Sequence, residues 1–410
     1  MDAARPGKPC FPLYTEGNHE KYKYREELNM LIRGASVFDG TGIKTGLDVR
    51  VEGGRIAHVG PKMQPLSGEE VINAQGKMLS PGFVDVHIHG FGGRDSMEGE
   101  DAVRFMAEKL PSHGVTGFLP TTMCATIEET RLCVSGVKQA MDNPTLGARV
   151  LGCHMEAPFL NPEKKGAQRL ETILKPNMSD FEAMTEGCQD VVRMITVAPE
   201  MEGAEEFIRA IRDRILVSVG HTMASCEICR QAADWGATQI THLFNAMTPF
   251  DHRNPGVPGA ALSDERYIVQ IIADLIHLHP AVVKTAIRAK GPDKVELITD
   301  AMMATDMPDG QYDLGGQPVC VMQGAARLVH GGNLAGSTLT MDKAVKNVVE
   351  QLGIEPEWAL RMAATTPAEA IGKGDCMGRI APGYLADLVL LDADWRVERT
   401  IVGGKTVYAR

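Results

Sequence analysis

Short apolar segments alternate with amphipathic segments through most of the chain. The apolar segments are a few residues long and rich in valine and isoleucine, which is typical of buried strands. We expect strands at residues 83–89, 115–120, 149–156, 191–197, 215–220, 238–242, 268–273 and 295–299. Between most of them, apolar residues recur with the period of a helix, for example at 101–113, 127–141, 204–213, 224–235 and 280–289.

This alternation predicts an α/β fold built around a (β/α)8 barrel over residues 81–374. The length of that segment suits such a barrel, which commonly spans about 200 to 400 residues. A doubly wound open sheet is the alternative. It would usually carry a Gly-x-Gly-x-x-Gly turn after its first strand, and Gly90-Phe91-Gly92-Gly93 does not have that spacing.

Both ends of the chain have a different texture. Residues 30–80 form short strand-like runs divided by glycine-rich turns, with Gly53-Gly54 as a strong hairpin signal, and similar runs return over 375–410. We expect these two segments to build one small β-sandwich domain. Residues 1–29 are polar and without a clear period, and we treat them as an N-terminal extension.

Composition narrows the functional classes. The chain of 410 residues has a net charge of −11, so it lacks the basic surplus that nucleic acids or anionic membranes require. No apolar run approaches the roughly 18 residues of a membrane span, and no secretory signal is visible. The nine scattered cysteines suit reduced thiols better than a disulfide framework. We therefore expect a cytoplasmic protein.

The first predicted barrel strand ends in His87 and His89. Side chains alternate along a strand, so both imidazoles point the same way, and neutral imidazole is a common ligand of zinc and iron. A pair of hydrogen-bonded histidines at a barrel rim is the alternative interpretation of this motif alone.

The ends of four other predicted strands carry similar chemistry. Catalytic groups of a barrel lie at the C-terminal ends of its strands. In chain order these ends present His154 and Glu156, then His221, His242 and Asp300. Together with the first pair they offer nitrogen and oxygen ligands, without thiolate, for one or two divalent metals, which points to a hydrolytic site. Cys226 and Cys229 are better explained as packing residues of a helix.

Two further segments belong to the same face. His277 and His279 follow the seventh strand. One of them can belong to the active face and the other can turn the chain before Pro280, and the sequence does not determine which. A long loop over residues 244–256 follows the sixth strand. It contains Asn245, His252 and Arg253, and is suited to an anionic group.

These residues carry a family resemblance. The stretch Pro81-Gly-Phe-Val-Asp-Val-His-Ile-His-Gly90 resembles the opening of the amidohydrolase superfamily. Within that superfamily, the chain resembles the N-acetylglucosamine-6-phosphate deacetylase family. The most specific motif is Thr241-His-Leu-Phe-Asn-Ala-Met247, because other amidohydrolases with His-x-His lack it. The similarity extends from about residue 30 to the C-terminus and includes Leu334-Ala-Gly-Ser-Thr-Leu-Thr-Met341.

The resemblance implies roles by position. Its metal ligands match Glu156, His221 and His242, with His87 and His89 at a second metal position that only some members have. Asp300 matches the catalytic acid/base, and His277 a residue near the N-acetyl carbonyl. The expected cofactor is one or two divalent metal ions, with zinc favoured over iron, manganese or cobalt. The residues matching contacts to the sugar phosphate are Asn245, Ala246 and Arg253.

The chain departs from the family at three positions. Ala157 and Leu275 stand where the family usually has glycine, and Gln168 stands where some members have a substrate-contacting histidine. If Ala157 and Leu275 line the site, they bear on sugar preference.

The resemblance predicts hydrolysis of N-acetylglucosamine 6-phosphate to glucosamine 6-phosphate and acetate, in amino-sugar catabolism, by a homodimer. The N-acetylgalactosamine isomer, another N-acyl compound, or a non-catalytic sugar-phosphate binder are the alternatives. The expected partner is thus a small phosphorylated amino sugar, with no nucleic acid and no membrane.

Overall fold

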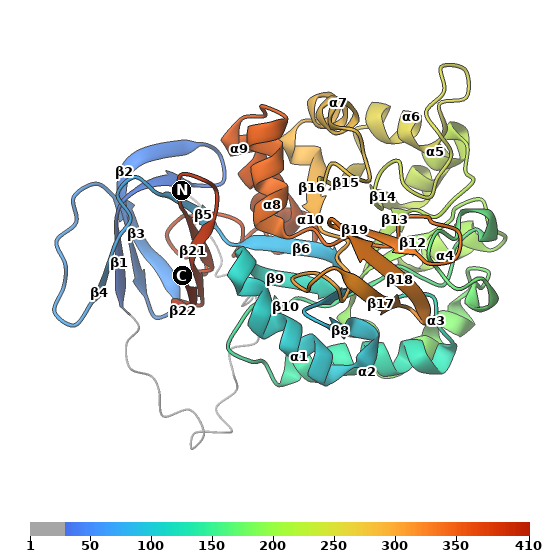
Figure 1. Ribbon diagram of the computed structural model, residues 1–410, viewed down its shortest axis with the longest axis horizontal. Coiled ribbons are helices and arrows are strands. Elements are labelled where there is room, and N and C mark those ends of the chain that lie inside the picture. Colours follow the sequence, from blue (N-terminus) through green and yellow to red (C-terminus); the bar gives the residue numbers. More distant parts are fainter. Residues whose placement is uncertain (1–28) are drawn as a thin grey trace, which may run out of the picture.

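The computed structural model describes residues 29–410, so the predicted extension at residues 1–29 lies almost wholly outside the described residues. Strands from both ends of this segment share one eight-stranded sheet, seen on the left of Figure 1. Its order is β22-β21-β20-β5-β1-β2-β3, with β4 paired to β1. The strands are β1 (Met30–Phe38), β2 (Ile43–Glu52), β3 (Arg55–Gly60), β4 (Glu70–Asn73), β5 (Met78–Pro81), β20 (Leu388–Leu391), β21 (Val397–Val402) and β22 (Lys405–Ala409). The domain boundaries themselves stay a prediction.

The middle of the chain forms a core of parallel strands, which we call the parallel core. One sheet has the order β10-β9-β6 and the other runs from β11 to β16 in sequence order. The strands are β6 (Phe83–Ile88), β9 (Val115–Pro120), β10 (Arg149–Val150), β11 (Cys153–Met155), β12 (Val192–Val197), β13 (Leu216–Val219), β14 (Ala237–Ile240), β15 (Ile268–Ile272) and β16 (Val295–Ile298). The eight predicted strands therefore appear at the predicted places.

The two parallel sheets are joined at both edges. The predicted third strand is interrupted at Gly152, whose φ of +139° suits glycine, so its first half pairs with β9 and its second half with β12. Parallel bridges at Thr121↔His154 and Ile88↔Ala301 connect the remaining edges. The carboxyl ends of strands far apart in sequence are thereby brought to one side.

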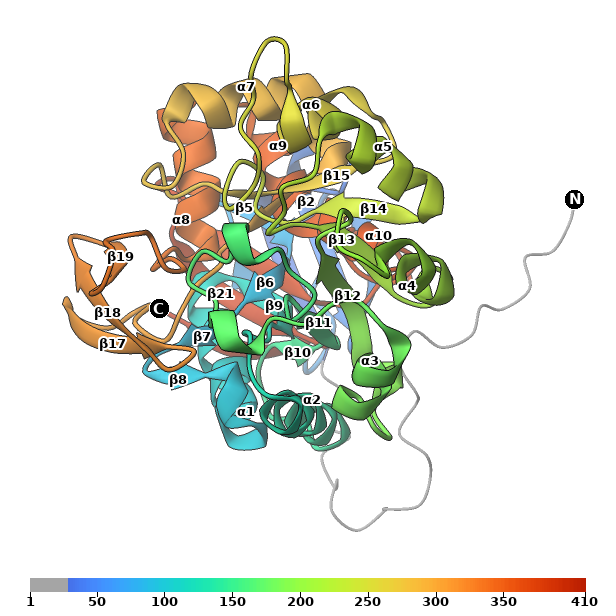
Figure 2. The same cartoon turned by 90° about the vertical axis from the view of Figure 1, so that its right-hand side faces the viewer.

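Helices surround the strands, as Figure 2 shows. They are α1 (Glu100–Lys109), α2 (Ile127–Asp142), α3 (Met178–Met184), α4 (Ala204–Ile211), α5 (Cys226–Trp235), α6 (Gly256–Ser263), α7 (Pro280–Lys290), α8 (Met341–Lys346), α9 (Pro356–Leu360) and α10 (Thr366–Ala370). Their starts are encoded locally. Thr126 and Glu129 form a reciprocal capping box at α2, and the His279 side chain accepts from the backbone N–H of Ala281 at α7.

A three-stranded antiparallel sheet after β16 was not predicted from the sequence. It consists of β17 (Gly310–Leu314), β18 (Gln317–Met322) and β19 (Ala325–Leu328). A separate short hairpin of β7 (Gly90–Phe91) and β8 (Arg94–Asp95) follows β6. Gly315 and Gly316, both with positive φ, form the first turn of the inserted sheet. This inserted sheet lies over the same side of the parallel core as the carboxyl strand ends (Figure 1).

The two parts of the molecule are tied by an ion pair between Arg149 and Asp387. The guanidinium donates from Nε to Oδ2 at 2.8 Å and from Nη2 to Oδ1 at 3.0 Å, and the carboxylate is only 3% exposed. A paired, bidentate geometry of this kind is directional, so it helps to orient the end sheet against the parallel core.

Two expectations from composition can be compared with the structure. No helix among the described residues is long and apolar enough to cross a membrane. Seven cysteines in the described residues carry free thiols, including the buried Cys226 and Cys229.

Candidate active site

The predicted ligand residues lie at or just beyond the carboxyl ends of their strands. His87 lies within β6 and His89 directly after it, and Glu156 directly follows β11. His221 and His242 each come two residues after a strand, β13 and β14. All five side chains are buried. The parallel core therefore gathers side chains from four strands at one point.

The backbone bends sharply where these side chains leave their strands. His221, His242 and Asp300 have φ values of 47°, 29° and 50°, in the left-handed region that non-glycine residues rarely adopt. Such strain persists only where surrounding contacts hold it, and it concentrates at functional sites. At Asp300 those contacts are backbone hydrogen bonds: its N–H donates to His87 O at 2.9 Å, and its carbonyl accepts from Ser337 N–H at 2.7 Å.

The Glu156 carboxylate is the centre of the cluster. Its Oε1 lies 3.0 Å from Nε2 of His242, 3.2 Å from Nε2 of His221 and 3.4 Å from Nε2 of His87. Its Oε2 lies 3.3 Å from Nε2 of His89. One carboxylate thus contacts all four imidazoles.

Asp300 joins the cluster on the side of the first histidine pair. Its Oδ1 lies 3.2 Å from Nε2 of His89 and 3.6 Å from Nε2 of His87, and these two nitrogens are 3.2 Å apart. The structure therefore forms two overlapping groups of potential ligands, His87–His89–Glu156 and Glu156–His221–His242.

The outer ring nitrogens fix which atoms face inward. Nδ1 of His221 lies 2.8 Å from Lys164 O, and Nδ1 of His89 lies 3.2 Å from Thr121 O. A carbonyl oxygen can only accept, so each Nδ1 carries a proton and donates it. In the neutral imidazole, Nε2 then presents a lone pair to the cluster.

This donor set fits a divalent cation. The Nε2 atoms of His221 and His242 are 3.0 Å apart, and lone pairs facing each other and a carboxylate are unfavourable unless a proton or a cation lies between them. Two ligands of one tetrahedral zinc ion, with bonds of about 2.0–2.1 Å, would be separated by about 3.3 Å. The spacing, the inward lone pairs and the carboxylate charge therefore agree with metal coordination.

Burial and neighbouring charges act in opposite directions on the ionisable groups of the cluster. Burial opposes ionisation of Glu156, but His87 and His221 hold the pKa of its carboxyl well below the usual range. Burial likewise opposes ionisation of Asp300, whose pKa is lowered to about 2 by His87 and His89. Burial opposes protonation of His89, yet hydrogen bonds from its ring to the carboxylates of Asp300 and Glu156 raise its pKa well above the usual value. Two ionised carboxylates thus require positive charge at this point.

His154 lies beneath the cluster. Its Nδ1 contacts Val86 O at 3.2 Å and its Nε2 contacts Thr196 Oγ1 at 2.9 Å, so neither ring nitrogen faces the ligand groups. Burial and the neighbouring His87 lower the pKa of His154 well below its usual value. This histidine therefore supports His87 by packing, with ring centroids 4.7 Å apart.

A cavity of about 320 Å³ opens onto the cluster. Among its lining residues are His89, Glu156, His221, His242 and Asp300, followed by Lys164, Gln168, Asn245, Ala246, His277, Leu314, Leu334 and Gly336. Lys164 is the one lysine or arginine among the described residues that line it. Segments from the 161–170 loop, the inserted sheet and the segment after it therefore complete the walls.

The structure separates the two histidines after the seventh strand. His277 lines the cavity, and its Nδ1 lies 2.7 Å from Asp274 Oδ2. Burial opposes protonation of His277, but the hydrogen bond that its Nδ1 donates to Asp274 raises its pKa above the usual value. His279 instead caps α7.

Three predicted substrate contacts have different surroundings. Arg253 is exposed, in a loop between β14 and α6 that projects from the body of the molecule (Figures 1 and 2), and it is not a lining residue of the cavity. Ala157 is 1% exposed and packs with Cys124 and Leu160. Gln168 lines the cavity, but its amide Nε2 contacts Glu156 Oε2 at 2.7 Å.

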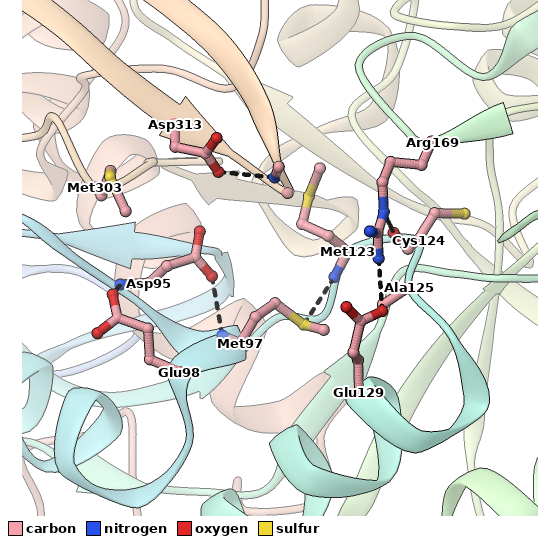
Figure 3. Close-up of a pocket in the computed structure, with 12 residues that line it drawn as sticks. Asp95, Met97, Glu98, Met123, Cys124, Ala125, Glu129, Arg169, Met303 and Asp313 are labelled. Carbon is pink, nitrogen blue, oxygen red and sulfur yellow. Dashed lines mark hydrogen bonds and ion pairs between the residues drawn. The ribbon is translucent and has the colours of Figure 1, made fainter. Parts of the chain in front are cut away.

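A second cavity of about 280 Å³ lies beside the first, and Met123 lines both. Its walls include Asp95, Glu98 and Asp313, with Arg169 bound to Glu129 on one side (Figure 3). This second cavity contains none of the predicted ligand residues.

Sequence reasoning missed the groups that orient the histidines. Oε1 of Gln270 lies 3.0 Å from Nδ1 of His87, and backbone carbonyl oxygens accept hydrogen bonds from Nδ1 of His89 and of His221. Such outer partners fix the tautomer of a ligating histidine. A polar Gln270 inside the apolar run of β15 was the one signal for this role in the sequence.

The comparisons with known proteins identify the family. The model of the amidohydrolase family matches residues 78–407. The chain belongs to the amidohydrolase family. Members that it resembles include the N-acetylglucosamine-6-phosphate deacetylase of Lysinibacillus sphaericus, which is 35% identical over 384 residues, 92% of this chain and 97% of that protein.

Two other relatives bear on the substrate. The N-acetylgalactosamine-6-phosphate deacetylase of Escherichia coli O157:H7 is 35% identical over 359 residues, 87% of this chain and 93% of that protein. A mutant N-acetyl-D-glucosamine-6-phosphate deacetylase of Mycobacterium smegmatis, solved with N-acetyl-D-glucosamine-6-phosphate, has a TM-score of 0.87 at 32% identity. That comparison covers 93% of this chain and 100% of the other. This amidohydrolase is thus similar to deacetylases of both sugar isomers.

If Glu156 is the shared ligand, replacing its carboxylate with an amide should abolish most metal binding. We expect Glu156→Gln to retain less than a tenth of the metal bound by the native protein, and a chelator that lowers the native Tm should leave the Tm of this variant unchanged. Elemental analysis and thermal melts measure both quantities. Glu163→Gln, an exposed carboxylate at the same cavity, is the control. Native metal content in Glu156→Gln would contradict the ligand assignment.

Proposed function

We propose that this protein hydrolyses the N-acetyl group of N-acetylglucosamine 6-phosphate, releasing glucosamine 6-phosphate and acetate. The observation that carries the proposal is that Glu156, four histidines and Asp300 form one cluster, and that a cavity of about 320 Å³ opens onto this cluster. Membership of the amidohydrolase family and the names of the relatives support the reaction and the sugar. Their names also support a place in amino-sugar metabolism.

The finer structural assignments belong to the same proposal. We infer that the joined strands of the parallel core form a (β/α)8 barrel, with the end sheet as a small β-sandwich domain. The cofactor is one or two divalent metal ions, held by Glu156, His221 and His242 and by His87 and His89. Zinc is favoured by the nitrogen and oxygen ligands. A homodimer and a cytoplasmic location stay predictions.

Asp300 is placed to transfer a proton from the attacking water to the departing nitrogen. A divalent metal, when bound, lowers the pKa of a coordinated water to about 7 and so provides hydroxide near neutral pH. Asp300 stays ionised, because its pKa is lowered to about 2, and it can therefore accept a proton from the attacking water. It then returns the proton to the departing nitrogen, so one carboxylate serves as base and then as acid.

His277 faces the same cavity from the loop after β15. Its contact with Asp274 keeps the ring oriented and favours the protonated form. A donor at this position would stabilise negative charge on the acetyl carbonyl oxygen as the water attacks. The ring is thus assigned to orienting and polarising the N-acetyl group.

The phosphate requires positive charge, and two residues compete for this role. Lys164 lines the cavity wall, whereas Arg253 matches the phosphate contact implied by the family resemblance but lies in an exposed loop. Asn245 and Ala246 line the cavity and would contact the sugar phosphate through amide and backbone groups. Binding at the remote phosphate orients the amide for attack.

The galacto isomer is a second candidate substrate, because a relative named for it is 35% identical to this chain. The test is acetate release from both 6-phosphates by metal-loaded protein. We expect kcat/KM for the gluco isomer to exceed that for the galacto isomer by at least 10-fold. The reverse ratio would assign the chain to the galacto isomer, and no acetate from either would refute the proposed function.

Asp300→Asn should keep the fold and the metal but lose turnover. The amide preserves size but cannot accept the proton, and general acid–base catalysis contributes about 10²- to 10⁴-fold. We expect kcat to fall by about that factor with native metal content. Turnover near the native value in this variant would remove Asp300 from the reaction.

Substrates with and without phosphate should separate the two candidate cations. A charge-assisted hydrogen bond contributes about 1.5–3 kcal/mol, or roughly 10- to 100-fold. We expect replacement of the residue that binds the phosphate, by Lys164→Met or by Arg253→Ala, to raise KM for N-acetylglucosamine 6-phosphate by about that factor and to leave KM for free N-acetylglucosamine almost unchanged. A residue whose replacement changes both KM values equally does not bind the phosphate.

A further inference from the structure

Gln168 lies against the Glu156 carboxylate, in a place where its amide is enclosed by protein. It is 2% exposed, its Nε2 lies 2.7 Å from Glu156 Oε2, and its Oε1 lies 2.6 Å from the backbone N of Cys124. Although Gln168 lines the cavity, its amide is thus engaged with two protein groups.

The orientation of this amide follows from its partners. The backbone N–H of Cys124 can only donate, so the atom facing it is the carbonyl Oε1. The NH2 group therefore faces Glu156, which as an ionised carboxylate can only accept. The same nitrogen lies 3.7 Å from Met123 Sδ. The partners of Gln168 therefore determine which atom of its amide is oxygen and which is nitrogen, and the flipped orientation is excluded.

The backbone of Cys124 is itself held on both sides. Arg169, the residue after Gln168, donates from Nε to Cys124 O at 3.1 Å and from Nη2 to Glu129 Oε2 at 2.7 Å (Figure 3). Glu129 belongs to the capping box of α2. Gln168 and Arg169 therefore bind the backbone N–H and the backbone C=O of one buried residue, Cys124, and α2 anchors the arrangement.

We propose that Gln168 is a positioning residue that holds Oε2 of Glu156 and so directs Oε1 toward Nε2 of His221 and His242, 3.2 and 3.0 Å away. The inference rests on the proposed function only in taking Glu156 as a metal ligand. It gives Gln168 a role in metal affinity, in place of the substrate contact that the family resemblance implies at this position. Partners of this kind typically change metal affinity by about 10- to 100-fold.

The decisive variant is Gln168→Met, which keeps the length of the side chain and removes the donor. We expect the Kd for Zn²⁺, measured by competition with a chromophoric chelator, to rise by about 10- to 100-fold. KM at saturating metal should change less than threefold, because the substrate does not contact the amide. With Co²⁺ in the site, the visible absorption band should shift, because the carboxylate is no longer held.

Gln317→Met is the matched control. Gln317 donates from its amide to Ala167 O, next to Gln168, and is not in contact with a ligand residue. Its Kd for Zn²⁺ should stay within twofold of the native value. Arg169→Met is a second variant, which loosens the Cys124 backbone by removing the bond to its C=O and leaves the Gln168 side chain in place, and its Kd should rise severalfold.

Two results would overturn the proposal. One is a native Kd for Zn²⁺ in Gln168→Met with a raised KM, which would make Gln168 a substrate contact. The other is a native Kd in Gln168→Met with a lowered Tm of the chelated protein, which would make the residue structural only. If Gln168→Met does not fold, a native Kd in Arg169→Met overturns the proposal instead. Zinc binding is measured without sugar, so its outcome is independent of whether N-acetylglucosamine 6-phosphate is the substrate.

Discussion

The approach of four imidazoles to one buried carboxylate is the constraint on which the rest of the structure depends. Nitrogen atoms that carry lone pairs lie 3.0–3.4 Å from the oxygens of Glu156, and Asp300 adds a second negative charge. Water is largely excluded, so the cost of bringing these groups together is not offset by hydration. A cation or shared protons must supply the compensating charge, and the surrounding fold must hold the groups in place.

The fold holds these groups in place at the carboxyl ends of its strands. Left-handed backbone at His221, His242 and Asp300 turns each side chain inward, and carbonyl or amide oxygens fix the outer ring nitrogens of His87, His89 and His221. The strain at each bend is offset by the hydrogen bonds of neighbouring strands and loops. Preorganisation of this kind lets the cluster orient a substrate without rearranging at the moment of reaction.

Much of this arrangement follows from patterns along the chain. Apolar runs located the parallel strands to within a residue or two, and the histidines and carboxylates at their ends come together because parallel strands share one carboxyl edge. The structure shows that one family departure carries backbone strain, since Leu275 has a φ of 64°, where glycine would be unstrained.

Other features could not be read from local pattern. The inserted sheet of β17–β19 is short and polar on one face, so it gives a weak signal between long helical and strand segments. The hydrogen bonds of Gln168 and Gln270 join residues far apart in sequence and depend on side-chain reach within the folded core. Whether Arg253 or Lys164 reaches a phosphate depends on where a long loop lies, which residue type alone does not determine.

The central claim is that these imidazoles and carboxylates hold a divalent cation at the floor of the cavity. Anomalous diffraction from crystals of zinc-loaded protein, recorded on both sides of the zinc edge, locates the ion directly. The account predicts a peak within coordination distance of Glu156 Oε1 and of Nε2 of His221 and His242. Ordered zinc found only elsewhere, with these three atoms still in mutual contact, would contradict it.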